Sequence, residues 1–235
     1  RPFPARMEFS TLTLYLTERC NYGCSYCYQE RSGRTLTVTD LDPALAFFSA
    51  HHATDSEIHF YGGEPLLAPE LIRRAVGRVE RSGRSGRGIR FGLTTNGSLL
   101  DDGIVGFLGE HGFRVMVSFD GLAQDRSRRK GSGPALVRTL ERLLRVPGLS
   151  VETNSVFTPK TVALLAGSLK LIQDVGVPDI HVSFNNLEPW PESALSELET
   201  QLSACARFAG RGRIPLDLFR TSRGDGFFVC GGAAN

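Results

Sequence analysis

The chain has 235 residues, 41% of them hydrophobic, so it is long enough to bury the core of one large domain or two small ones. Its 27 basic and 25 acidic side chains give a net charge of +2, which offers no reason to expect nucleic acid or a membrane surface as a partner. No apolar run reaches the roughly 18 residues of a membrane span. Of its five cysteines, three are crowded into one short segment, which is untypical of a secreted disulfide framework, and we expect a cytoplasmic protein.

Short β-rich runs alternate with amphipathic runs along the chain. The expected strands are Leu12–Thr17, Glu57–Tyr61, Ile89–Thr94, Arg114–Ser118, Ser150–Phe157 and Ile180–Phe184. The expected helices are Pro43–His51, Pro69–Arg81, Asp101–His111, Ala135–Val146, Thr161–Val175 and Ser193–Phe208. Repeated strand–helix units require right-handed crossovers and a parallel sheet. Six units make three quarters of an eight-stranded barrel, so the sequence predicts an α/β fold, an open partial (β/α)6 TIM-like barrel over residues 1–210.

The first expected helix has a recognisable start. Asp42 can accept hydrogen bonds from the free amides of a first helical turn, and Pro43 suits the first helical position. The pair therefore predicts a helix that begins at Pro43.

The densest chemical signal is a group of three cysteines just after the first expected strand. Cys20, Cys24 and Cys27 have a C-x3-C-x2-C spacing, with Tyr26 directly before the last of them. Iron–sulfur clusters are normally held by four cysteine thiolates, so three without a nearby fourth indicate a cluster with one iron open to another ligand. A zinc site is the alternative, although structural zinc takes four ligands, often as two pairs, and no second pair follows.

The expected strands bring the other polar candidates to the same end of the barrel. In such barrels the chemistry takes place at the carboxyl ends of the strands, on the loops that lead into helices. The cysteines follow the first strand, and Gly62–Pro65 follows the second. The candidates at the ends of the remaining four strands are Asn96, Ser118, Asp120, Asn154 and Leu187. The sequence therefore predicts one functional rim.

The cysteine segment and the strand-end segments that follow it in the chain resemble the radical S-adenosylmethionine (SAM) superfamily and, within it, the peptide-modifying branch. The cysteines match the superfamily's C-x3-C-x-Φ-C motif, in which Tyr26 takes the aromatic position, and Gly62-Gly63-Glu64-Pro65 resembles its GGE motif. The later segments that resemble the branch are Thr95-Asn96-Gly97, Ser118-Phe119-Asp120-Gly121 and Gln124-Asp125-x-x-Arg128, in which Gln replaces the usual His. The resemblance extends from about Leu12 to Trp190.

The resemblance implies two cofactors. A [4Fe–4S] cluster would be held by Cys20, Cys24 and Cys27, and the amine and carboxylate of SAM would chelate its remaining iron. Gly62 and Gly63 would let the ligand approach the backbone closely, and Glu64 would orient the SAM ammonium group.

Further rim residues would bind other parts of SAM. Ser118 and Asp120 are suited to the ribose hydroxyls, although both also suit helix caps and turns. Arg128 would pair with the SAM carboxylate in a bidentate contact, with Arg138 as a competitor for that role.

Four more residues have two possible roles or a single weak one. Tyr26 would present its backbone to the adenine or shield the cluster. Asn96 and Asn154 would donate to the cofactor or satisfy backbone groups at the strand ends. Leu187 would pack on the adenine.

Residues 211–235 resemble the start of a further domain. Phe227–Val229 forms a hydrophobic run that leads into Cys230 and two glycines. In the branch that the chain resembles, such a segment begins a SPASM or Twitch extension, which holds auxiliary iron–sulfur clusters. The resemblance implies that Cys230 is an auxiliary ligand, and a free thiol in a β-hairpin is the alternative. Cys205, on an expected helix, is expected to be buried packing.

The resemblance implies an oxidoreductase that cleaves SAM reductively to a 5′-deoxyadenosyl radical and modifies a peptide, such as the precursor of a ribosomally made natural product. The change would be a crosslink, a thioether, an oxidation or an epimerisation. Its partners would be that peptide or protein and a low-potential electron donor of the flavodoxin or ferredoxin type. The alternatives are an anaerobic sulfatase maturase that forms formylglycine and, outside enzymes, a zinc-stabilised binding domain.

Overall fold

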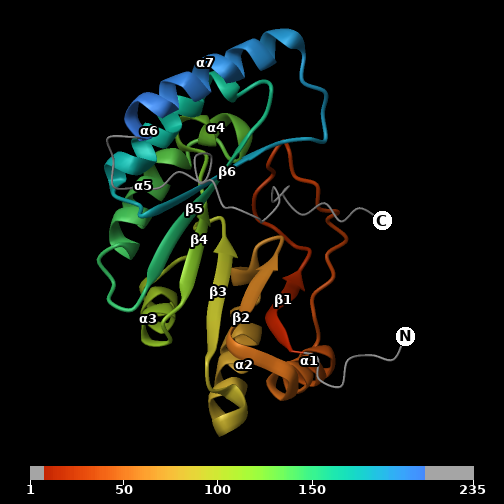
Figure 1. Cartoon of the computed structure of the whole chain (residues 1–235). Helices are drawn as coiled ribbons and strands as arrows, with labels where there is room; N and C mark the ends of the chain where they lie inside the picture. Colours follow the sequence, from red (N-terminus) through yellow and green to blue (C-terminus); the bar gives the residue numbers. More distant parts are fainter. Residues whose placement is uncertain (1–7, 210–235) are drawn as a thin grey trace.

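A computed structural model, which describes residues 8–209, contains one parallel six-stranded sheet with the strands in sequential order (Figure 1). The strands are β1 (Phe9–Thr17), β2 (His52–Gly62), β3 (Ile89–Thr95), β4 (Arg114–Ser118), β5 (Ser150–Phe157) and β6 (Asp179–Phe184). β1 and β6 are the two edges and do not pair with each other. The sheet is therefore an open, partial barrel, which confirms the fold that the sequence predicts.

Helices follow the strands and lie around the outer side of the sheet (Figure 1). They are α1 (Val38–His51), α2 (Pro69–Arg81), α3 (Asp102–Glu110), α4 (Gln124–Ser127), α5 (Gly133–Leu143), α6 (Leu165–Val175) and α7 (Glu192–Ala209). Short 3-10 turns precede several of them, among them Pro65–Leu67 after β2 and Gly121–Ala123 after β4. The expected bounds of α2, β4 and β5 match the structure.

The predicted start of the first helix is wrong. α1 begins at Val38, five residues earlier, and Pro43 lies inside the helix. Leu41 and Leu45 are buried against the sheet, and this packing stabilises the early turn even though proline cannot donate a backbone hydrogen bond there. Asp42 does not cap the helix, because its carboxylate accepts hydrogen bonds from Arg74 of α2 at 2.6 and 3.0 Å.

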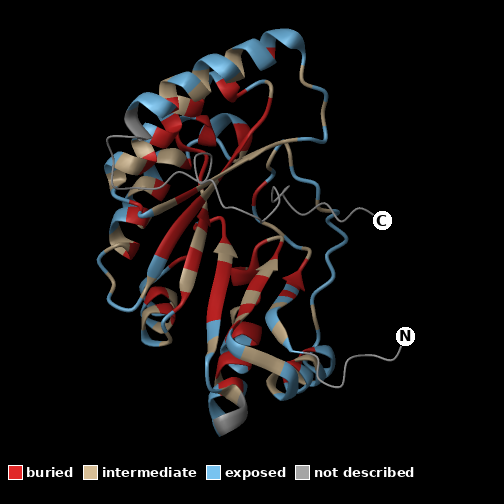
Figure 2. Ribbon diagram, viewed as in Figure 1, coloured by how far each residue is buried: buried red, intermediate tan, exposed pale blue. Residues whose placement is uncertain are grey.

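The core lies between the outer face of the sheet and the helices, where buried residues gather (Figure 2). Alternate residues of a strand point to opposite faces, so Phe60, Phe91 and Phe113 all point outward. Their rings stack with centroids 5.3 to 6.4 Å apart. α2 completes this layer with an apolar stripe that includes Leu71, Ile72, Ala75, Val76 and Val79.

The inner face of the sheet is polar near the amino ends of the strands. Arg114 of β4 donates to both carboxylate oxygens of Glu57 of β2, at 2.7 and 2.8 Å, and lies 3.5 Å from Glu152 of β5. His59 lies 3.0 Å from Glu57. Gly92 of β3 makes room for this group, because a Cβ atom there would lie 2.4 Å from the His59 ring and 2.5 Å from the Glu57 carboxylate. The charged group therefore forms a floor beneath the carboxyl end of the barrel.

We expect Glu57 to make the stability of the fold depend on pH. Although burial raises the pKa of Glu57, hydrogen bonds from His59 and Arg114 outweigh that effect and lower it from 4.5 to about 2. A carboxyl with a lowered folded-state pKa stabilises the fold above its unfolded pKa, and this contribution is lost as pH falls from 4.5 towards 2. Glu57→Gln should therefore lower the free energy of unfolding at neutral pH, and the deficit should shrink through this window in urea titrations. A deficit that does not change with pH would contradict this role.

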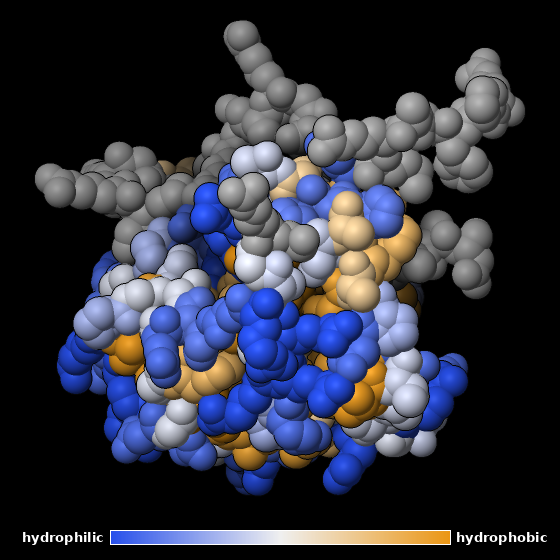
Figure 3. Space-filling view, turned by 90° about the horizontal axis from the view of Figure 1, so that it is seen from below, coloured by the Kyte–Doolittle hydropathy of each residue, from blue (hydrophilic) through white to orange (hydrophobic). Residues whose placement is uncertain are grey.

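The face at the amino ends of the strands carries mainly hydrophilic side chains, with small hydrophobic areas between them (Figure 3). In the part of the chain that the structure describes, no helix combines the length and the apolar character that crossing a membrane requires.

Candidate functional site

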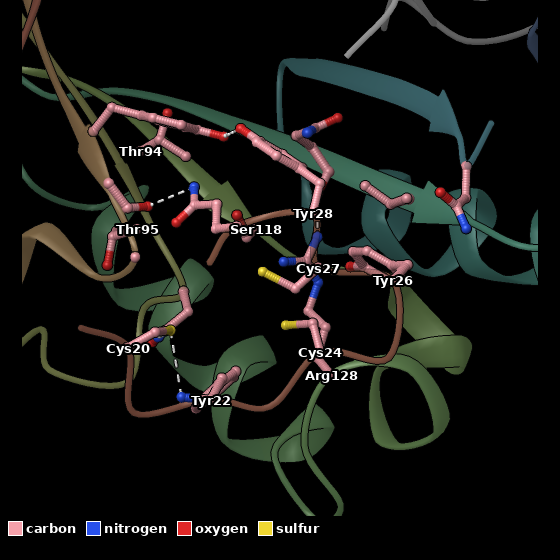
Figure 4. A pocket seen from close by; sticks show the side chains of 18 of the residues that line it. Cys20, Tyr22, Cys24, Tyr26, Cys27, Tyr28, Thr94, Thr95, Ser118 and Arg128 are labelled. Carbon is pink, nitrogen blue, oxygen red and sulfur yellow. Dashed lines mark hydrogen bonds between the residues drawn. The ribbon is translucent and has the colours of Figure 1, made fainter. Parts of the chain in front are cut away.

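A pocket opens at the carboxyl ends of the strands, between the loop after β1 and the ends of β2 to β6 (Figure 4). Most of the residues predicted from the sequence line it. They are Cys20, Cys24, Tyr26, Cys27, Gly62, Gly63, Asn96, Ser118, Arg128, Asn154 and Leu187. Glu64 and Asp120 are predicted site residues that do not line the pocket. Cys230 and residues 211–235 lie outside the described residues.

The loop that carries the three cysteines is held on both sides. Ser25 N donates to Ser127 O at 2.8 Å, which ties the loop to α4. Asn96 Nδ2, after β3, donates to Asn21 Oδ1 at 2.8 Å, and Tyr22 N donates to Cys20 Sγ at 3.4 Å. The sulfur atoms of Cys24 and Cys27 point towards the side of the pocket on which Cys20 lies (Figure 4). The loop therefore presents all three thiols to one hollow.

As a set of donors, the three thiols suit a cluster. Among residues 8–209, no three His, Cys, Asp or Glu side chains lie close enough together to hold one metal ion. Tetrahedral zinc, with Zn–S bonds of about 2.3 Å, would draw its sulfur ligands to roughly 4 Å from one another. In a [4Fe–4S] cluster each cysteine binds a different iron, so thiols spaced around a hollow suit it. Burial raises the pKa of the Cys24 thiol, and the Arg128 guanidinium opposes that effect.

Gly62 and Gly63 allow the end of β2 to touch the backbone after β1. Gly63 N donates to Thr17 O at 2.7 Å. A Cβ atom on Gly62, whose φ is 138°, would lie 2.5 Å from Thr17 O, and one on Gly63 would lie 2.3 Å from Arg19 O. These glycines are thus required for chain packing beside the cysteine loop, whatever they contribute to a ligand.

We expect Gly63→Ala to destabilise the fold and displace the cysteine loop. The new methyl group would meet backbone, which cannot rotate away as a side chain can, and overpacking of this kind costs about 1–3 kcal/mol. Urea unfolding measures the loss. Gly106→Ala in α3 is the matched control, because no atom lies within 4 Å of its Cβ position, and it should stabilise the helix by about 0.5–1 kcal/mol. Equal stability of the two variants would contradict the packing role.

Glu64 joins the ends of β2 and β3 rather than facing the pocket. Its carboxylate is completely buried and accepts from Thr95 Oγ1 and Asn96 N, both at 2.7 Å, and from Leu66 N at 3.1 Å. Burial raises the pKa of Glu64, and these hydrogen bonds oppose the change. In this structure its carboxylate positions Asn96, which in turn holds the cysteine loop.

Asp120 has a different role from the expected contact with ribose. Its carboxylate is completely buried and accepts from Tyr26 Oη at 2.7 Å, Ser127 Oγ at 2.5 Å, Arg128 at 2.9 Å and Val156 N at 2.9 Å. These four donors, all from the protein, occupy both oxygen atoms of the Asp120 carboxylate. Asp120 therefore connects the cysteine loop to the segment after β4 and to β5. Of the expected ribose pair, only Ser118 lines the pocket.

Arg128 combines a buried ion pair with a wall of the pocket. Its side chain is 7% exposed, donates to Asp120 and to Asn154 O, and places its guanidinium 5.4 Å from the centre of the Tyr26 ring. Burial lowers the pKa of Arg128, but the Asp120 carboxylate raises it by more. The net pKa is therefore raised, and the group stays cationic. Its Nε atom is buried without a hydrogen-bond partner in the described chain. An unpaired cationic donor on a pocket wall suits an anionic group of a ligand.

The remaining predicted residues surround the same hollow. Asn154 Oδ1 accepts from Ser183 Oγ at 3.4 Å, and Asn96 Oδ1 accepts from Ser98 Oγ at 2.6 Å. Leu187 is 65% exposed and lies at the pocket edge. These three side chains therefore border the pocket and could contact a ligand in it.

The sequence reasoning missed several lining residues. They are Tyr22, Tyr28, Gln29, Tyr61, Thr94, Met116, Val156 and Phe184, among others. Strand alternation could have found some of them, since Thr94 and Met116 lie two residues before Asn96 and Ser118 on the inner face. Gln29 Nε2 donates to Gly62 O at 3.1 Å, whereas Gln29 Oε1 is buried with no partner in the described part of the chain. That oxygen suits a donor group of a ligand.

Solved structures share this fold at low sequence identity. Native anSMEcpe with bound AdoMet and Cp18Cys peptide aligns with a TM-score of 0.75 and 17% identity, over 89% of this chain and 63% of that one. Streptococcus suis SuiB bound to the precursor peptide SuiA aligns with a TM-score of 0.65 and 15% identity, over 90% of this chain and 49% of that one. The barrel described above therefore occurs within longer proteins.

Sequence comparison finds closer relatives. An uncharacterized protein of Methanocaldococcus jannaschii is 30% identical over 190 residues, which cover 76% of this chain and 63% of that protein. A GTP 3′,8-cyclase of Rhodococcus opacus is 26% identical over 170 residues, covering 69% of this chain and 46% of the cyclase. The chain thus spans about half to two thirds of the length of these relatives. Residues 14–162 match the family described as the Radical SAM superfamily. This segment contains the cysteine loop, the paired glycines and Arg128. The chain belongs to the radical SAM superfamily.

Proposed function

We propose that this chain is the catalytic barrel of an enzyme that cleaves SAM reductively and modifies a peptide. The observation that carries the proposal is the convergence of three cysteine thiols, Gly62 and Gly63 on one pocket at the carboxyl ends of the strands. The cysteine loop is fixed at the pocket by hydrogen bonds from two sides.

The residues present fit the two cofactors. Cys20, Cys24 and Cys27 would hold a [4Fe–4S] cluster. Arg128, with its unpaired Nε, would bind the carboxylate of SAM, and the unpaired Oε1 of Gln29 would accept from its ammonium group. When bound, SAM and the cluster supply a carbon radical that takes a hydrogen atom from an unactivated C–H bond.

Other residues of the chain would complete SAM binding. Ser118 offers a hydroxyl to the ribose, and Asn154 and Asn96 offer amides at neighbouring strand ends. Tyr26 is held by its bond to Asp120, which fixes the backbone that would meet the adenine. Leu187 would cover the adenine at the pocket edge and exclude water there.

Two observations favour a peptide as the substrate. The pocket walls carry aromatic and apolar side chains, including Tyr28, Tyr61, Phe184 and Leu187, that suit amino-acid side chains. Both solved structures described above have a peptide bound. The sulfatase-maturase type remains the second option within this class, with formylglycine as its product.

A nucleotide substrate is a second candidate, because several sequence relatives are named GTP 3′,8-cyclase. The two substrates can be separated directly. Reconstituted, reduced protein would be incubated with SAM and either GTP or synthetic peptides encoded by short reading frames next to the gene. We expect 5′-deoxyadenosine to form and the peptide mass to change, with GTP recovered intact. Consumption of GTP with unchanged peptides would replace the peptide proposal with the nucleotide one.

We further propose a low-potential electron donor of the flavodoxin or ferredoxin type, since the cluster must be reduced before each cleavage.

We also propose that Cys230 begins an extension with an auxiliary cluster. The relatives are longer than the part of them that this chain matches, which leaves room for such a domain. Iron analysis of the native polypeptide tests this: more than four iron atoms per chain, reduced by Cys230→Ala, is the expected result.

A further inference from the structure

Three tyrosines form a connected group from the pocket to the surface, which we name the tyrosine chain: Tyr28, Tyr61 and Tyr15. Tyr28 follows Cys27 directly, and Tyr61 ends the inner face of β2 just before Gly62. Tyr15 of β1 lies opposite Tyr61 in the register of the two parallel strands. Strand pairing and the cysteine loop thus bring three phenols together from distant parts of the sequence.

The contacts within the tyrosine chain are continuous. Tyr28 Oη and Tyr61 Oη are hydrogen-bonded at 2.9 Å. The rings of Tyr15 and Tyr61 meet edge to face with centroids 5.3 Å apart. Tyr28 and Tyr61 line the pocket, and the ring of Tyr28 extends towards Thr94 on the far wall (Figure 4). Tyr15 does not line the pocket and is 43% exposed.

Packing alone does not account for the hydroxyl groups. On the outer face of the same sheet, aromatic packing is provided by Phe60, Phe91 and Phe113. On the inner face, beside the thiols, the chain instead has phenols whose oxygen atoms contact one another. A phenol O–H bond is weaker than the C–H bond of a primary alkyl group. A phenol is therefore a ready hydrogen-atom donor to any carbon radical that forms in the pocket.

We propose that the tyrosine chain discharges carbon radicals that form in the pocket when no substrate is bound, and carries the oxidising equivalent to the surface at Tyr15. This inference rests on the proposed function. It gives the protein a second, protective activity, which spares the cysteine loop from radical attack.

The steps balance at each stage. Tyr28 or Tyr61 transfers the hydrogen atom of its O–H group to the carbon radical, which becomes a C–H bond and leaves a phenoxyl radical. Tyr28 and Tyr61 exchange a hydrogen atom along their hydrogen bond, so the phenoxyl radical reaches Tyr61. Tyr61 then takes an electron from Tyr15 across the edge-to-face ring contact and a proton from water, while the exposed Tyr15 gives its phenol proton to water, so that one hydrogen atom in total has moved and the radical is on Tyr15. There, one electron from the same low-potential donor that reduces the cluster and one proton from water restore the O–H group.

The test uses SAM as the probe and deuterium as the label. Reconstituted protein is exchanged into D2O, reduced with dithionite and mixed with SAM without any peptide, so that each phenol carries deuterium. We expect the 5′-deoxyadenosine that forms to contain deuterium by mass spectrometry. We also expect freeze-quenched samples to show a tyrosyl radical in their electron paramagnetic resonance spectrum.

Variants separate the chain from other donors. Tyr28→Phe/Tyr61→Phe should lose most of the deuterium and the tyrosyl signal. Tyr15→Phe should keep the deuterium but prolong the tyrosyl signal, because the outlet to the surface is gone. Tyr22→Phe is the matched control, since Tyr22 lines the same pocket but its ring faces Arg129, and it should change neither readout.

Each outcome decides between the proposals. Deuterium that is absent in the native protein, or unchanged in the double variant, would overturn the tyrosine chain while leaving the proposed function in place. An absence of 5′-deoxyadenosine would overturn the proposed function and this inference with it. If the double variant does not fold, as judged by thermal unfolding and iron content, the two single variants give the same test, and each should lower the deuterated fraction.

Discussion

Cys24→Ala should abolish SAM cleavage, because the substitution leaves the cluster with two cysteine ligands from this loop. The pocket is lined by three cysteines of the described chain, Cys20, Cys24 and Cys27. We expect the reconstituted variant to lose its iron and the brown absorbance near 400 nm, and to form no 5′-deoxyadenosine. Iron analysis and chromatography of the reaction products measure both effects.

Cys205→Ala is the matched control for this loss. Cys205 lies in α7, is completely buried in the core, and burial raises the pKa of its thiol to about 11. It packs as a small apolar side chain, so its replacement should leave the iron content and SAM cleavage unchanged. Full turnover by Cys24→Ala, or loss of iron from Cys205→Ala, would contradict the assignment of the cluster to the loop after β1.

Asp120→Ala should cause the largest loss of stability among single substitutions near the site. Its removal leaves the 7%-exposed Arg128 guanidinium as a buried charge without its carboxylate partner. Breaking a buried pair in this way costs about 3–5 kcal/mol. Tyr26, Ser127 and Val156 would lose an acceptor at the same time. The free energy of unfolding in urea measures the effect.

Asp102→Ala is the control, because it also breaks an Asp–Arg pair, but at the surface. Asp102 is 94% exposed and lies 2.8 Å from Arg142. Surface ion pairs contribute only about 0–1 kcal/mol, so this variant should be close to the native protein in stability. Asp120→Asn keeps the shape of the side chain and should fall between the two. If Asp120→Ala were no less stable than Asp102→Ala, the proposed connecting role of Asp120 would be wrong.

The strand and helix pattern was predictable because its signals are local. β4 follows from alternation of apolar residues, β5 from a short run that includes Val, Thr and Phe, and α2 from an apolar stripe at helical spacing bounded by Pro69. The start of α1 was not predictable in this way. Asp42 and Pro43 form a good local start signal, but the burial of Leu41 and the ion pair of Asp42 with Arg74 depend on α2 and the sheet, which lie elsewhere in the chain.

Most of the residues singled out from the sequence line the pocket, because a parallel βα barrel brings all its strand ends to one rim. The roles of the acidic residues were harder to predict. Glu64 and Asp120 sit at strand ends as expected, yet both turn into the protein and accept donors from neighbouring strands and loops. A buried carboxylate must find hydrogen-bond partners, and the sequence does not show which donors will surround it.

The fold class, the family and the candidate cysteine loop could be predicted, since each depends on residue type and spacing along one stretch of chain. Three features became visible in the folded chain alone: the buried pair of Asp120 and Arg128, the link that Glu64 makes between two strands, and the contacts of Tyr61 with Tyr15 and Tyr28. These contacts join residues that are distant in sequence. They follow from strand register, from barrel curvature and from the need to pair every buried charge, and these are properties of the assembled sheet.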